Sequence, residues 1–113
     1  MSRRLCFALD LVDDAAKIAE YEGFHTPGRV WPAIVDDIRA QGIEGMEIWR
    51  TGERMVMIAT VADDYPRARN IPPEYDQWET LMWGFQRALP HAALGQKWVP
   101  MDQIFDLAQQ KGG

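Results

Sequence analysis

Tyr21 and His25 are the residues whose types and spacing best suggest chemistry in this chain. They stand four positions apart, and side chains at positions i and i+4 share one face of a helix. A histidine can give and take protons near neutral pH, because its unperturbed pKa lies in that range. A tyrosine hydroxyl beside it could orient a hydroxylated substrate or relay a proton. The alternative interpretation is a packed aromatic side chain next to a surface histidine at a helix end.

The sequence around this pair predicts two short helices in succession. Asp13-Asp14 supply an N-cap and negative charge for the first helix, which we expect to run to about Tyr21 with Ala15 and Ile18 on its inner face. Thr26-Pro27-Gly28 then predicts a short loop. The second helix is opened by Trp31-Pro32, where proline is tolerated in the first turn, and it is ended by Gly42. Its apolar stripe consists of Trp31, Ile34, Val35 and Ile38.

Length, charge and cysteine content narrow the class of protein. We expect one domain over residues 1–113, since 47% of the 113 residues are hydrophobic and can form a core. The net charge is −5 and the basic residues are scattered, which argues against a nucleic-acid partner. Cys6 is the only cysteine, so no intrachain disulfide is possible. We find neither a bilayer-spanning apolar run nor a signal peptide, and we expect no membrane partner and a cytoplasmic location.

Alternating apolar and polar residues predict the strands of an antiparallel sheet. Residues 4–11 form one strand, and residues 45–50 and 55–61 form a hairpin around a turn that contains Gly52. The second hairpin strand is apolar on both faces, which indicates a central position in the sheet. Residues 98–101 are interpreted as an edge strand that residues 104–107 extend, because Pro100 cannot donate a hydrogen bond to a central ladder.

Pro72-Pro73 precede a third, long helix that we expect Pro90 to end. Its residues at helical spacing are Trp78, Leu81, Met82, Phe85 and Leu89. The resulting order of elements predicts an α+β fold of the ferredoxin-like kind, with an antiparallel sheet and helices on one face. Such a sheet leaves its other face open, and a second copy would cover it. We therefore expect a homodimer of the dimeric α/β-barrel type.

The chain resembles the L-rhamnose mutarotase family over nearly its whole length. The resemblance rests on the order and spacing of Phe7-Ala8-Leu9-Asp10-Leu11, Tyr21-x-x-x-His25 with Trp31-Pro32, Glu47-Ile48-Trp49, Trp78-x-x-x-Met82 and Lys97-Trp98-Val99-Pro100-Met101. It implies that His25 is the catalytic proton donor, that Tyr21 binds the sugar and that Trp78 lines the pocket. It also implies an isomerase that interconverts the α and β anomers of a 6-deoxyhexose, L-rhamnose first, through acid–base ring opening. This reaction needs no metal and no cofactor.

Three positions depart from the best-known pattern of that family. A sugar-binding tyrosine often stands where this chain has Met46, and a second tryptophan often stands where it has Glu79. The loop between His25 and Trp31 is also longer than in some members. Methionine cannot donate a hydrogen bond, whereas Glu79 can accept bonds from sugar hydroxyls and is a candidate substrate-binding residue. These changes make L-fucose a rival to L-rhamnose.

Other conspicuous side chains have structural interpretations. We expect Trp31 to be a packing anchor and Trp98 to pack across a dimer interface, while His91 lies on the surface. The 2 histidines are too few and too far apart to suggest a metal site. Asp36-Asp37 are interpreted as solvent-facing charges, and Asp63-Asp64 as part of a loop near the pocket.

Two other classes of function remain open from the sequence. Small monooxygenases and lactone isomerases also use dimeric ferredoxin-like domains, and fold alone does not decide between these chemistries. A noncatalytic sugar-binding domain would bind the sugar without accelerating the exchange of its anomers. The shared face of Tyr21 and His25, together with Trp78, favours the mutarotase.

Overall fold

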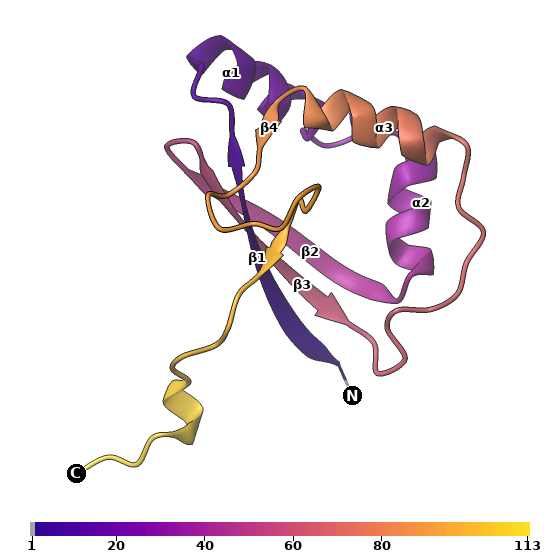
Figure 1. The fold of residues 1–113 in the computed structure, drawn as a ribbon. Coiled ribbons are helices and arrows are strands. Elements are labelled where there is room, and N and C mark those ends of the chain that lie inside the picture. The colour runs from indigo at the N-terminus through magenta and orange to yellow at the C-terminus, as the bar shows by residue number, and fades with distance from the viewer. Residues whose placement is uncertain (1) are drawn as a thin grey trace.

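The computed structural model describes residues 2–113 as a curled antiparallel sheet with three α-helices (Figure 1). The strands are β1 (Arg3–Leu11), β2 (Ile43–Thr51), β3 (Arg54–Val61), β4 (Gln86–Arg87) and β5 (Val99–Pro100). The helices are α1 (Ala15–Phe24), α2 (Pro32–Ala40) and α3 (Glu74–Trp83), followed by a short 3₁₀ helix, η1 (Leu107–Gln109). The predicted α+β architecture is confirmed.

The sheet has the strand order β2-β3-β1-β4, and β5 also pairs with β1. The central position predicted for β3 is therefore confirmed. The hairpin between β2 and β3 turns at Gly52, whose positive φ of 56° is a conformation that favours glycine. The order places β2 at an edge of the sheet.

The core lies between the sheet and the helices. Because side chains alternate along a strand, Leu9 and Leu11 share one face of β1, and they pack there with Met55 of β3. The same cluster receives Ile34 from α2 and Met82 from α3. A smaller cluster near the other end of the strands contains Ile43, Ala59 and Val61. Both clusters hold the helices against this one face of the sheet.

The first two helices begin where the sequence predicts. Asp14 caps α1, and its carboxylate accepts a hydrogen bond from the Lys17 backbone N–H at 3.0 Å. Ala15 is exposed, so the inner face of α1 is formed by Ile18 and Tyr21 without it. Pro32 occupies the first turn of α2 as expected.

The prediction that Asp36 and Asp37 of α2 both face solvent is wrong for Asp37. Asp36 is exposed, but Asp37 is buried. Two hydrogen bonds of 2.9 and 3.2 Å from the Arg69 guanidinium to the Asp37 carboxylate compensate its charge. Burial of this carboxylate therefore depends on a residue 32 positions away.

The third helix is shorter than predicted, and this difference shapes the cavity described below. It ends at Trp83 rather than before Pro90 because Gly84 caps it and the chain turns there into β4. Gln86 pairs with Leu11 of β1, and Arg87 pairs with Asp10. Phe85 and Leu89 are buried as expected, although neither is part of a helix.

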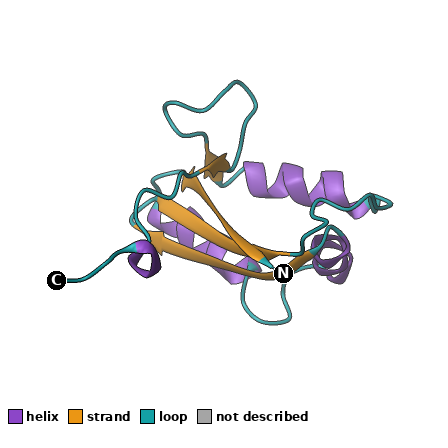
Figure 2. Ribbon diagram, turned by 90° about the horizontal axis from the view of Figure 1, so that it is seen from below, coloured by secondary structure: helices purple, strands orange, loops and turns teal. Residues whose placement is uncertain are grey.

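The C-terminal segment leaves the sheet after β5. The predicted edge strand is confirmed over Val99–Pro100, which pairs with Phe7 and Ala8. Its extension through residues 104–107 is wrong, because the chain runs away from the body of the protein there (Figures 1 and 2). No helix within residues 2–113 has the length and apolar character needed to cross a membrane.

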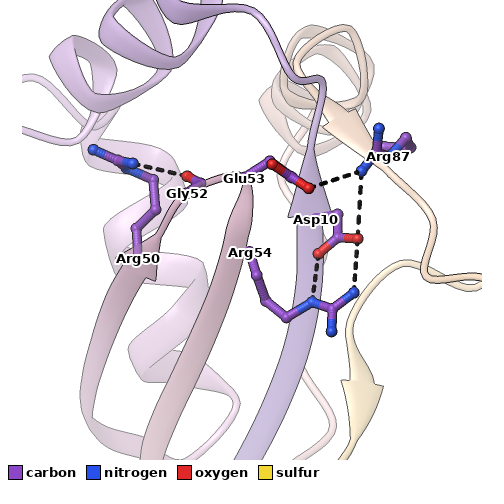
Figure 3. A network of polar contacts seen from close by, with 6 residues as sticks. All are labelled: Asp10, Arg50, Gly52, Glu53, Arg54 and Arg87. Carbon is purple, nitrogen blue, oxygen red and sulfur yellow. Dashed lines mark hydrogen bonds and ion pairs between the residues drawn. The ribbon is translucent and has the colours of Figure 1, made fainter.

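A buried carboxylate joins three strands on the face of the sheet opposite the helices (Figure 3). Asp10 of β1 is 2% exposed and accepts hydrogen bonds of 2.8 and 3.1 Å from Arg54 of β3. Arg87 of β4 lies 3.7 Å from the same carboxylate and 3.7 Å from Glu53. The hydrogen bond from Arg54 and the charges of both arginines lower the pKa of the Asp10 carboxyl below its usual value.

We predict that Asp10→Asn lowers the free energy of unfolding at pH 7 by about 1.5–3 kcal/mol, the range for hydrogen bonds to charged groups. Because the Asp10 pKa is lowered in the folded state, its contribution is full above the unfolded pKa near 4 and is lost as the pH falls through the folded value. Urea unfolding at several pH values should show the two proteins converging in acid. Asp36→Asn, at an exposed position, is the control. An equal loss for both variants would contradict the role assigned to Asp10.

Candidate active site

A cavity of about 930 Å³ lies between the helices and the core face of the sheet. Its lining includes Tyr21 and His25 from α1, Trp78 and Glu79 from α3, Met46 from β2 and Gln86 from β4. This volume lies within the usual range for small-molecule sites, roughly 300–1,000 Å³. All four site residues predicted from the sequence therefore border one space.

Tyr21 lies in the wall of this cavity, at the inner face of α1. Its side chain is 4% exposed, and its hydroxyl oxygen accepts a hydrogen bond of 3.1 Å from Gln86 Nε2. Burial raises the pKa of the Tyr21 hydroxyl above its usual value. The residue is thus a neutral phenol at physiological pH, with a proton to donate.

His25 is the C-cap residue of α1, one turn beyond Tyr21. Its Nδ1 lies 2.8 Å from the backbone carbonyl oxygen of Tyr21. A carbonyl oxygen only accepts hydrogen bonds, so Nδ1 carries the proton and Nε2 is the nitrogen left for a substrate. The imidazole also stacks on the Tyr21 ring, with 4.4 Å between ring centroids and 34° between planes. The predicted pairing of these two side chains on one helix face is confirmed.

Trp78 forms an aromatic wall beside the histidine. Its ring is buried, and its centroid lies 5.8 Å from that of His25 and 5.1 Å from that of Trp31. Both contacts are edge-to-face, an arrangement that aromatic rings favour. Trp31 packs against the core as expected. A flat apolar wall of this kind suits the C–H face of a pyranose ring.

Glu79 is held between a phenol and an ammonium group. The Tyr75 hydroxyl donates to its carboxylate at 3.3 Å, and Lys97 Nζ lies 3.5 Å from the same oxygen. Lys97 Nζ also donates to the Glu79 backbone carbonyl at 3.0 Å and lies 5.1 Å from the ring centroid of Trp83. Burial and the Glu79 charge raise the pKa of the Tyr75 hydroxyl. Glu79 is therefore an oriented acceptor.

Other residues considered from the sequence have different locations. His91 is exposed, as expected, and Glu47 is absent from the cavity lining and accepts a hydrogen bond of 3.1 Å from Trp49 Nε1. Trp98 packs against the core of its own chain and borders the cavity. Within residues 2–113, no group of three or more His, Cys, Asp or Glu side chains could hold a metal ion.

Gln86 is the cavity residue that sequence reasoning missed. The apolar spacing of Phe85 and Leu89 predicts a helix there, and a glutamine on a helix carries no information about a pocket. Gly84 was the available signal, because glycine disfavours the interior of a helix. A strand beginning after Gly84 places Gln86 and Arg87 on opposite faces.

Comparison with known proteins agrees with this geometry. A family model described as L-rhamnose mutarotase matches residues 4–107. The chain belongs to this family. Proteins similar to this chain are named L-fucose mutarotase and L-rhamnose mutarotase, and mutarotases are isomerases. This chain is accordingly a sugar mutarotase.

Two relatives and one solved structure resemble this mutarotase. An L-fucose mutarotase of Xanthomonas campestris pv. campestris is 46% identical over 112 residues, which cover 95% of this chain and 90% of that protein. A UPF0734 protein of Dictyostelium discoideum is 33% identical over 109 residues, which cover 88% of this chain and 86% of that protein. The crystal structure of an L-rhamnose mutarotase from Formosa agariphila superimposes with a TM-score of 0.68 at 18% identity, covering 93% of this chain and 98% of that one. At that identity the structural match supports the fold.

Proposed function

We propose that this mutarotase acts on free 6-deoxyhexoses, L-fucose first and L-rhamnose second, with His25 as its proton-transfer group. The observation that carries the proposal is the convergence of Tyr21, His25 and Trp78 on one cavity, with His25 Nδ1 bound to a carbonyl. Met46 stands where the family often has a tyrosine, and the relative that is 46% identical is named an L-fucose mutarotase. Both observations support L-fucose.

The proposed mechanism uses proton transfer alone. Protonated His25 donates from Nε2 to the ring oxygen of the sugar, and the bond between that oxygen and C1 breaks with its electron pair going to oxygen. The anomeric hydroxyl loses its proton to water as C1 becomes an aldehyde. Rotation about the C1–C2 bond then presents the other face of the aldehyde. On ring closure the C5 hydroxyl oxygen attacks C1 and returns its proton to Nε2, while the carbonyl oxygen takes a proton back from water and becomes the anomeric hydroxyl of the other anomer. Such acid–base catalysis typically contributes about 10²–10⁴-fold.

The remaining cavity residues would position the sugar. Tyr21 and Glu79 would bind hydroxyl groups, as a donor and an acceptor respectively. Trp78 would stack on the C–H face of the ring. Met46 and Met82 would contact the C6 methyl group, because a thioether side chain adapts to apolar groups of irregular shape. We propose that residues 1–113 carry out this work as one domain.

We predict that His25→Ala reduces the acceleration of anomer exchange by about 10²-fold or more, the usual size of acid–base catalysis. Saturation-transfer NMR on L-fucose and L-rhamnose measures the exchange, and circular dichroism checks the fold. His91→Ala, at the exposed histidine, should exchange the anomers as the unaltered protein does. Exchange near the wild-type rate in folded His25→Ala would move the acid to Glu79, which borders the cavity, rather than to Glu47.

We predict that the enzyme prefers a methyl group at C6, because the thioether side chains of Met46 and Met82 line the cavity and would contact that group in the proposed complex. L-fucose and L-rhamnose should both be accelerated, whereas L-galactose and L-mannose, which differ from them by a C6 hydroxyl, should be poor substrates. Met46→Tyr adds a hydroxyl to the pocket and should lower the ratio of the L-fucose rate to the L-rhamnose rate by about 5- to 10-fold, about 1 kcal/mol. Equal rates across all four sugars would show that the pocket does not recognise these groups.

We propose that the protein is a homodimer formed through the open face and edge of the sheet. Trp49 of the edge strand β2 is 63% exposed, and Val56 and Ile58 of β3 alternate with core residues and so face away from the helices. The C-terminal segment adds Ile104 and Phe105, which are 96% and 63% exposed. A second copy of the chain would cover these exposed apolar side chains, which are typical of an interface when they meet in one surface. The cytoplasmic location likewise stays a prediction.

We predict a dimer at micromolar concentration in sedimentation velocity experiments. Truncation after Met101 removes the exposed apolar side chains of the C-terminal segment but keeps β5, and it should shift the protein toward monomer. Leu94→Ser, a control at a fully exposed loop position, should leave the dimer intact. A monomer for the full chain, unchanged by truncation, would refute the interface.

A further inference from the structure

Gln86 is a buried polar side chain in the wall of the cavity, and nothing in the mechanism above uses it. It is 8% exposed and borders the cavity together with Tyr21 and His25. Its backbone pairs with Leu11 of β1, next to the pairing of Arg87 with Asp10. The alternation of side chains places Gln86 toward the cavity because Arg87 points to the opposite face of the sheet.

Only half of the Gln86 amide is satisfied. Its Nε2 donates to the Tyr21 hydroxyl at 3.1 Å, while its buried Oε1 accepts no hydrogen bond from any of residues 2–113. Leaving a buried acceptor unpaired is unfavourable, and a methionine of similar length would fill this space without that penalty. Among residues 2–113, the Tyr21 hydroxyl is therefore the hydrogen-bond partner of this amide.

That bond determines how the Tyr21 hydroxyl can act. An amide N–H only donates, so the phenol oxygen of Tyr21 is the acceptor. The hydroxyl proton must then point elsewhere, and the cavity is the space that Tyr21 borders. Since burial raises the pKa of this phenol, the proton stays in place at neutral pH. A hydroxyl without this partner could rotate and accept a bond from a ligand instead of donating one.

We propose that Gln86 is a positioning residue that commits the Tyr21 hydroxyl to donate a hydrogen bond to an oxygen atom of the bound sugar. Gln86 acts on the sugar through Tyr21. This inference rests on the proposed function, because it assumes that the cavity binds a monosaccharide. In the proposed complex the Tyr21–Gln86 pair recognises a sugar oxygen that accepts a hydrogen bond, and Glu79 recognises a sugar hydroxyl that donates one.

The test is a double-mutant cycle on KM for L-fucose exchange, with Gln86→Met, Tyr21→Phe and the double variant. Gln86→Met should raise KM by about 3- to 10-fold, the value of one neutral hydrogen bond, and change kcat less than about 2-fold. In the Tyr21→Phe background Gln86→Met should raise KM no further, because its action requires the hydroxyl. The melting temperature of the single variant Gln86→Met should equal or exceed that of the wild type, since the unpaired Oε1 is removed. Gln86→Leu provides a second apolar replacement.

Arg87→Lys is the matched control, one residue away on the opposite face of the sheet. It keeps a positive charge beside Asp10, so β4 should keep its register and KM should be unchanged. Two outcomes would overturn the role assigned to Gln86 and leave the proposed function standing. One is a wild-type KM for folded Gln86→Met or Gln86→Leu, and the other is a double variant in which the two increases in KM multiply. If the wild-type protein accelerates exchange of no 6-deoxyhexose, the proposed function fails, and this inference fails with it.

Discussion

The arrangement of the active-site wall depends on one ion cluster behind it. Asp10 is almost completely buried, and the arginines that compensate its charge come from the neighbouring strands on either side, Arg54 of β3 and Arg87 of β4. Arg54 gives this carboxylate two hydrogen bonds, and Arg87 adds a second positive charge 3.7 Å away, which favours the register of the two-residue strand β4 that places Arg87 beside Asp10. With Arg87 on the open face of the sheet, Gln86 must lie on the cavity face. A charge requirement on one side of the sheet thereby positions a polar side chain on the other.

Tyr21 is the second point on which the site depends, because three parts of this residue have separate partners. Its backbone carbonyl oxygen accepts a hydrogen bond from His25 Nδ1, and its ring packs against the imidazole. Its hydroxyl oxygen accepts a hydrogen bond from Gln86 Nε2. The helical spacing of four residues is what allows the first two contacts together. The end of one helix thus sets the tautomer of His25, so that Nε2 is the nitrogen to which we assign proton transfer.

Local patterns in the sequence were sufficient for the parts of the structure that depend on neighbouring residues. The cap at Asp14, the central position of β3 and the shared face of Tyr21 and His25 all follow from spacing of a few residues. Burial of Asp37 did not follow, because its partner Arg69 lies 32 positions away in a loop. The predicted end of α3 was wrong for a similar reason. Apolar spacing continues through Phe85 and Leu89, but pairing of β4 with β1 prevails over it once Gly84 interrupts the helix.

The cavity is lined by both polar and apolar side chains, and this mixture is consistent with a ligand that itself carries hydroxyl and methyl groups. Glu79 is oriented by Tyr75 and Lys97, whereas Met46 brings only an apolar thioether side chain to the cavity. A 6-deoxyhexose likewise carries hydroxyl groups around most of its ring and a methyl group at C6. The ring of His25, to which we assign proton transfer, is instead held by a backbone carbonyl. Substitutions at Met46 or Glu79 could therefore change which sugar is bound while Nε2 of His25 stays in place, so that recognition and proton transfer vary independently within this fold.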